Sequence, residues 1–208
     1  MDASSLMTFP LGLYSRARYA GFGMQNMLFH ALGSVDPAVR DYVKQLKPEI
    51  RKDIHDEILA LLDRDVRQIA EGMYPPTVLL PESPVQHFSR LPRLVLAATL
   101  AQIRRRQGRT AVFNRSASRF LEKLPRYYRR NFHFQPNGYL SSESAELYEH
   151  QVEILFQGAS DAMRRLIIPP LKKHFSGNPD GEGLHFLEVA AGTGRATRFV
   201  KLAFPKAR

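Results

Sequence analysis

The clearest pattern of apolar positions along the chain runs from Ile50 to Met73, where apolar residues recur every three or four positions. This period predicts an amphipathic helix of about six turns. Pro48 opens it, and Gly72 with the pair Pro75-Pro76 ends it. The charged residues between the apolar ones, Asp65 among them, are placed on the solvent-facing side of this helix.

Prolines and small polar residues mark the other predicted elements. Further helices are expected to open at the following places: Asp36-Pro37, Pro92 (running from Leu94 to about Gln107), Ser116 (ending at Leu124) and Ser141 or Ser142 (one face running through Tyr148 to Leu166). A Pro-Asn-Gly turn is expected at 136–138. The first 35 residues show no sustained period, and no element is predicted there.

The pattern changes after the turn-rich stretch 176–183. Residues 184–189 (Leu-His-Phe-Leu-Glu-Val) form a short apolar run that predicts a buried parallel strand. A small-residue loop, Ala190 to Gly194, follows, and then a stretch compatible with a helix. Strand, small-residue turn and helix in this order allow backbone amides and a helix N-terminus to approach a nucleotide-like ligand. At Gly192 and Gly194 the backbone can take a positive φ, and a Cβ there would intrude on such a ligand.

Composition narrows the classes of protein. The 208 residues contain no cysteine, which excludes disulfides, thiolate metal sites and cysteine nucleophiles. The seven histidines lie far apart, and none has the spacing of a known metal motif, so no metal site is predicted. No apolar run is long enough for a transmembrane span, and the N-terminus lacks the features of a secretory signal. The expected location is the cytoplasm.

Charge is concentrated in one part of the chain. The net charge is +10, yet the stretch Arg90 to Arg130 holds twelve basic residues and a single acidic one, Glu122. The rest of the chain is therefore close to neutral. This basic block is either a solvated helix face that the part of the protein missing from this sequence neutralises, or a surface for an anionic partner such as nucleic acid, anionic lipid or an acidic protein. Aromatic residues are interleaved with its cations between Tyr127 and Phe134.

The residues around the glycine loop show which nucleotide-binding motifs the sequence can match. There is no Gly-Lys-Ser/Thr ending, so a phosphate-binding P-loop is excluded. Thr197 stands where the dinucleotide fingerprint needs a third small residue, which counts against a nicotinamide-dependent oxidoreductase. Residues 186–194, Phe-Leu-Glu-Val-Ala-Ala-Gly-Thr-Gly, resemble motif I of the class I S-adenosylmethionine-dependent methyltransferases. Ala190 stands where that family usually has its first glycine, as is also common in the ubiquinone/menaquinone-biosynthesis type.

The resemblance implies a cofactor, S-adenosylmethionine, and residues that would hold it. Glu188 would organise the loop and the amino group of the methionine moiety. The residues expected to line the cofactor are Glu188, Ala190, Ala191, Gly192, Thr193 and Gly194, with Tyr148 on the preceding helix as a weaker candidate. A tyrosine followed by an acid at that place, Tyr148-Glu149, also occurs in the family, although an amphipathic helix explains Tyr148 equally well. No catalytic residue is identified.

The resemblance also implies a fold and a domain division. We expect an α/β, Rossmann-like class I methyltransferase domain beginning at 136 and interrupted after its first strand and helix, so that the chain is a mostly helical fragment of a longer protein. Residues 1–135 are expected to form a helical cap region. The expected activity is methyl transfer to a small-molecule acceptor. The fragment alone is expected to bind the cofactor weakly or not at all and to be inactive. The alternative is a non-catalytic module that binds a polyanion through its basic block.

Overall fold

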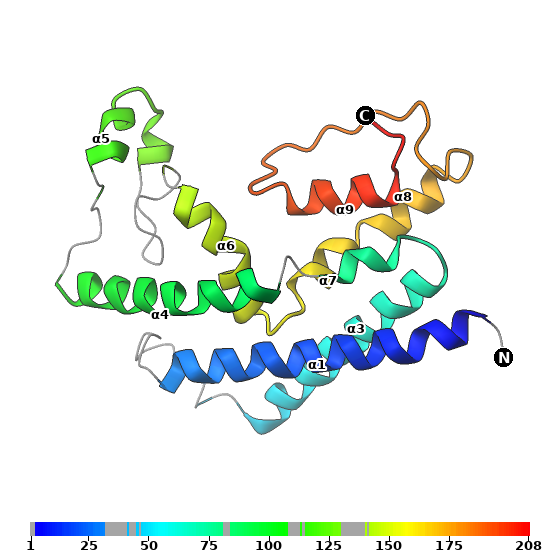
Figure 1. Ribbon diagram of the computed structural model, residues 1–208, viewed down its shortest axis with the longest axis horizontal. Helices are drawn as coiled ribbons and strands as arrows, with labels where there is room; N and C mark the ends of the chain where they lie inside the picture. Colours follow the sequence, from blue (N-terminus) through cyan, green and yellow to red (C-terminus); the bar gives the residue numbers. More distant parts are fainter. Residues whose placement is uncertain are drawn as a thin grey trace. The chain divides into compact units, whose positions relative to one another are not determined.

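The computed structural model describes residues 3–31, 41, 45, 47–80, 84–107, 113, 115–129, 140 and 142–208. Helices make up the regular structure of these residues (Figure 1). In chain order, with η for a 3-10 helix, they are α1 (Ala3–Ala31), α3 (Pro48–Ala70), η1 (Pro76–Leu79), α4 (Pro84–Arg106), α5 (Arg115–Leu121), η2 (Arg126–Arg129), α6 (Ser142–Leu155), α7 (Ser160–Arg165), α8 (Ile168–His174) and α9 (Arg195–Ala203). The predicted helix opening at Asp36-Pro37 and the predicted turn at 136–138 lie outside the described residues.

The expected α/β, Rossmann-like fold class is wrong for this chain, because the described residues contain no strand or sheet. The predicted strand at 184–189 is an extended segment instead. Beyond the turn bond from the Leu184 amide to the Gly181 carbonyl, its backbone pairs with Arg208. The Arg208 carbonyl accepts from the Phe186 amide at 2.8 Å, and the Arg208 amide donates to the Leu184 carbonyl at 3.0 Å. One paired residue is no ladder, and Leu187 and Val189 are 91% and 83% exposed rather than buried between helices.

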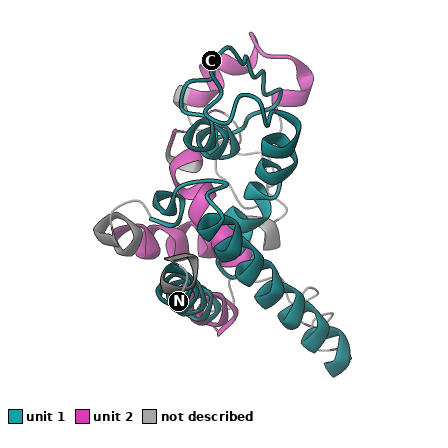
Figure 2. Cartoon of the chain, turned by 90° about the vertical axis from the view of Figure 1, so that its right-hand side faces the viewer, with its two compact units in different colours: residues 1–23, 47–81, 156–208 teal, residues 24–46, 82–155 magenta. Residues whose placement is uncertain are grey.

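Two compact units divide the chain (Figure 2). The first consists of residues 1–23, 47–81 and 156–208, and the second of residues 24–46 and 82–155. Each unit therefore combines segments that are distant in the sequence. The predicted domain boundary between 135 and 136 stays a prediction. Among the described residues no helix combines the length and apolar character that a bilayer span requires.

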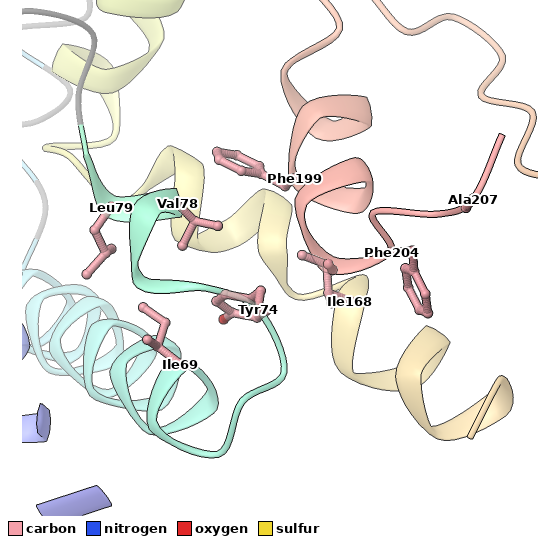
Figure 3. Packing of buried hydrophobic residues seen from close by; sticks show 9 residues of the cluster. Ile69, Tyr74, Val78, Leu79, Ile168, Phe199, Phe204 and Ala207 are labelled. Carbon is pink, nitrogen blue, oxygen red and sulfur yellow. The ribbon is translucent and has the colours of Figure 1, made fainter. Parts of the chain in front are cut away.

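The core of the first unit joins α3, η1, α8 and α9 (Figure 3). Its buried members are Ile69, Tyr74, Val78, Leu79, Ile168, Phe199, Ala203, Phe204 and Ala207. On the extended segment, Leu184 and Phe186 pack against this cluster. The apolar face predicted for residues 50–73 is buried only in its second half, since Ile50 and Ile54 remain exposed.

One residue of α3 was assigned to the wrong face. Asp65 is 2% exposed, and its carboxylate accepts two hydrogen bonds from the guanidinium of Arg165, from Nε at 2.8 Å and from Nη2 at 2.7 Å. The hydroxyl of Tyr74 donates to the same carboxylate at 2.7 Å. The Arg165 guanidinium also lies 4.9 Å from the centre of the Phe199 ring. A charged residue at this position is therefore buried with its partners rather than solvated.

Several helices differ from the sequence prediction. α1 extends over most of the first 35 residues and was not predicted, because apolar side chains such as Phe9 and Leu13 also lie on its exposed side. α4 begins at Pro84 and contains Pro92 within it. The helix predicted from Ser142 to Leu166 is broken at Gln157 and Gly158, which have φ values of 51° and 83°. A Cβ on Gly158 would lie 2.9 Å from the Phe22 ring, so this close approach requires glycine.

In the second unit, α4 packs against α6. Leu94, Ala101, Leu147 and Ile154 are its buried apolar residues on these helices. His150 is also buried on α6, and its Nε2 lies 2.9 Å from Oε1 of Gln25. His150 is thus part of the packing of this unit and does not contribute to the loop described next.

Candidate functional site: the glycine loop

The glycine loop, defined as residues 188–194, connects the extended segment to α9 in the first unit. Its side chains from Glu188 to Thr193 are exposed. The extended segment is anchored by Leu184 and Phe186 and α9 by the buried Phe199, so both flanks are fixed on the core while the loop faces solvent. The fold therefore presents this loop on a rigid support.

The backbone of the loop adopts the left-handed conformation at every second residue. The φ values are 60° at Ala190, 60° at Gly192 and 73° at Gly194. Positive φ at the two glycines agrees with the expectation from the sequence. Ala190 adopts the same conformation at a cost of about 1–2 kcal/mol, which gives a physical reason for the glycine that the methyltransferase family usually has there.

Space is open beside both glycines. A Cβ added to Gly192 or Gly194 would meet no atom of the described residues within 4 Å. The positive φ explains why glycine occurs at these two positions. Close packing by the described residues gives no second reason for glycine there. A ligand can therefore approach the backbone closely at both residues. Gly194 is also the N-cap of the nine-residue helix α9, whose first amides carry the partial positive charge of a helix N-terminus.

Two side-chain contacts hold the ends of the loop. At the beginning, the Thr197 hydroxyl of α9 donates a hydrogen bond to Oε2 of Glu188. At the end, Arg195 of α9 donates two hydrogen bonds to Asp161 of α7, from Nε at 3.1 Å and from Nη2 at 2.6 Å. The Gly194 amide closes the turn inside the loop by donating to the Ala191 carbonyl at 2.9 Å. These contacts restrict the loop without filling the space next to its glycines.

Asp161 is the buried carboxylate behind the loop, with a side chain that is 4% exposed. Burial by itself raises its pKa, but the hydrogen bonds and charge of Arg195, together with the charges of Arg18 and Arg165, outweigh burial and lower the pKa to about 2. The sequence analysis missed both Asp161 and Arg195. The available signal was the position of Arg195 directly after Gly194, where a long cation at a helix start requires an anionic partner.

The low pKa of Asp161 predicts a loss of stability in acid. Since the folded pKa lies below the unfolded value of 3.8, the contribution is complete above about pH 4 and is lost as the pH falls through about 2. It amounts to roughly 2 kcal/mol. Urea unfolding at about pH 5.5 and about pH 2.5 measures the loss, which should be smaller by about two thirds of this amount in Asp161→Asn than in the unmodified chain. An equal loss in both proteins would contradict the assignment.

Not every predicted site residue belongs to this loop. Glu188, Ala190, Ala191, Gly192, Thr193 and Gly194 lie together in it. Tyr148 lies on α6 in the second unit and is 41% exposed, so it is not a core tyrosine of the kind that an amphipathic helix suggested. No known protein family matches the chain, and no curated protein or solved structure is significantly similar to it. The loop geometry is therefore the observation from which a function is argued.

Chemically, the loop offers one carboxylate, a helix N-terminus and two glycines with open space. The described residues contain no group of three or more histidine, aspartate or glutamate side chains able to hold a metal ion. The Oε1 atom of Glu188 accepts no hydrogen bond from the described residues, while Oε2 is oriented by Thr197. An organic ligand that carries both a cationic group and hydrogen-bond acceptors fits this arrangement.

Proposed function

We propose that the glycine loop binds S-adenosylmethionine and that the protein transfers its methyl group to an acceptor, a small molecule in our proposal. The observation that carries the proposal is the alternation of left-handed residues at Ala190, Gly192 and Gly194, with no chain atom within 4 Å of a Cβ at either glycine. The proposal rests on the loop and its resemblance to motif I, and it does not depend on a sheet.

Each part of the loop has a role in this proposal. Glu188 would accept a hydrogen bond from the cationic amino group of the cofactor, through the oxygen that Thr197 does not occupy. The glycines would let the backbone approach the cofactor closely. Arg195 and its buried partner Asp161 would keep the loop and the start of α9 in place. These residues bind and position the cofactor.

Methyl transfer itself requires little further chemistry from the protein. When bound, S-adenosylmethionine would supply an electrophilic methyl group to the acceptor atom, with S-adenosylhomocysteine as the second product. A proton, where the acceptor carries one, passes to a base or to water. Holding the two reacting atoms in line supplies most of the acceleration. We therefore assign binding and positioning roles and no catalytic base.

The substitution Gly194→Ala tests the proposed binding. A Cβ at a φ of 73° strains the backbone by about 1 kcal/mol and occupies the space that the cofactor would need. We expect the dissociation constant for S-adenosylmethionine, measured by calorimetry or by NMR titration, to increase at least about tenfold, which corresponds to about 1.4 kcal/mol.

Gly72→Ala is the matched control. Gly72 has a φ of 75°, also lacks any atom within 4 Å of a Cβ, and lies just after α3, outside the glycine loop. Both substitutions should therefore lower the free energy of unfolding by a similar amount, whereas only Gly194→Ala should weaken binding. Equal affinities of the two variants for the cofactor would count against the loop as the binding site.

A further inference from the structure

The basic block divides into two parts with different surroundings. Arg90 and Arg93 on α4 lie close to Glu146 on α6, at 3.5 Å and 3.3 Å. Hydrogen bonding to Arg93, the larger effect, and the charges of both arginines lower the pKa of Glu146. An acid from outside the block therefore neutralises part of its charge at this end. The sequence analysis did not pair this end of the block with an acid of the same chain.

The other end, residues 117–129, shows no such ion pair among the residues that the structure describes. Arg119, Lys123 and Arg126 are exposed, and they form no ion pair with any residue that the structure describes. The single acidic residue of this stretch is Glu122. Because unpaired exposed cations attract anions, charge complementarity points to an anionic partner here.

Three large aromatic side chains are exposed among these cations. Phe120 is 56% exposed, Tyr127 63% and Tyr128 44%. The rings of Tyr127 and Tyr128 are perpendicular, with centroids 5.5 Å apart. The two leucines of the stretch, Leu121 and Leu124, are partly buried. The exposed apolar groups are therefore flat rings rather than aliphatic chains.

Hydrogen bonds fix the backbone that carries these rings and cations. Arg129 of η2 donates to the carbonyls of Leu124 at 2.7 Å and Glu122 at 3.0 Å, which follow the end of α5. The Tyr128 amide donates to the Pro125 carbonyl at 2.9 Å. Arg129 thus fixes η2 against the turn after α5 (labelled in Figure 1), and the exposed residues on both sides have a defined arrangement. A preordered surface loses less conformational entropy when it binds.

We propose that this α5–η2 surface binds single-stranded nucleic acid. It consists of Arg119, Phe120, Lys123, Arg126, Tyr127 and Tyr128. The three cations contact backbone phosphates, and the rings stack on bases, which is the combination used by proteins that bind single strands with little sequence preference. A lipid surface offers phosphates but no bases, whereas a single strand offers both a phosphate for each cation and a flat base for each exposed ring. The inference is independent of cofactor binding, and Gly194→Ala should leave it unchanged.

The experiment is a titration of the whole chain against a fluorescent single-stranded oligonucleotide of about twelve nucleotides, followed by anisotropy. Three phosphate contacts predict that log K falls with log salt concentration with a slope of about −2. In the double variant Phe120→Leu/Tyr127→Leu, which keeps apolar side chains and removes the rings, affinity for the oligonucleotide should fall at least about tenfold. Affinity for heparin, which has no bases, should stay the same.

Charge variants and vesicles complete the test. Arg119→Gln/Lys123→Gln/Arg126→Gln should weaken both ligands and flatten the salt slope, while Arg93→Gln, whose arginine pairs with Glu146, should have little effect. Absence of oligonucleotide binding at low salt would overturn the proposal. Equal loss of oligonucleotide and heparin binding in the leucine variant would also overturn it. So would binding to phosphatidylserine vesicles by both the unmodified chain and the leucine variant, if neither binds the oligonucleotide.

Discussion

The substitution Arg165→Met should lower the free energy of unfolding by about 3–5 kcal/mol. Arg165 is 1% exposed and Asp65 is 2% exposed, so the substitution leaves a carboxylate buried without its cation. Two hydrogen bonds, of 2.8 Å and 2.7 Å, are lost together with the packing of the guanidinium on Phe199. Tyr74 still donates to Asp65, but one neutral donor does not compensate a buried charge. Urea or thermal unfolding measures the effect.

Arg16→Met is the matched control for this prediction. Arg16 also donates two hydrogen bonds to an aspartate of α3, Asp63, at 3.1 Å and 3.0 Å, but the two side chains are 56% and 40% exposed. Water already solvates both groups, so we expect a change of at most about 1 kcal/mol. The double variant Asp65→Leu/Arg165→Met should recover much of the lost stability, because it leaves neither member of this ion pair buried without its partner. If Arg16→Met and Arg165→Met lower the free energy of unfolding by similar amounts, the burial of the Arg165–Asp65 pair is contradicted.

The second large effect is expected for Gly181→Ala, which should destabilise the first unit by about 2–5 kcal/mol. The φ of Gly181 is +86°, which strains any residue with a Cβ. The added Cβ would also lie 2.8 Å from the Phe204 Cβ, 2.9 Å from the Ala207 Cβ and 3.1 Å from the Ala207 amide nitrogen. Phe204 and Ala207 are buried, and an amide nitrogen cannot rotate away, so the chain has to shift.

Gly183→Ala separates the two causes. Gly183 lies two residues later, has a φ of +78°, and has no atom within 4 Å of an added Cβ. It therefore shares the backbone strain and lacks the clash, and we expect a loss of about 1 kcal/mol. The midpoint of urea unfolding compares the two variants directly. If both lose the same stability, the close packing of Gly181 against Phe204 and Ala207 is contradicted.

The sequence predicted well those features that depend on neighbouring residues along the chain. The helix α3 follows from its apolar period and from Pro48 and Gly72, and the positive φ at Gly192 and Gly194 follows from their place in a small-residue turn. The helix predicted from Ser116 is present as α5, but it ends at Leu121, three residues before the end predicted from Pro125.

Features that depend on distant residues could not be predicted in the same way. Asp65 looks like a solvent-exposed residue until Arg165, one hundred positions later, is placed beside it. The apolar segment at 184–189 has the composition of a buried strand, but a strand also needs a neighbour, and only Arg208 pairs with it among the described residues. The break at Gly158 depends on its contact with Phe22 of α1, a helix that the sequence pattern did not predict.

The central claim is that the glycine loop binds S-adenosylmethionine, and NMR of the isotopically labelled chain tests it most directly. Backbone amide shifts report weak as well as tight binding and identify the residues involved. With S-adenosylmethionine at about millimolar concentration we predict the largest shift changes at the amides of residues 188–195, and no such changes with NADH or in Gly194→Ala. Unchanged loop amides, or equal changes in Gly194→Ala, would contradict the account.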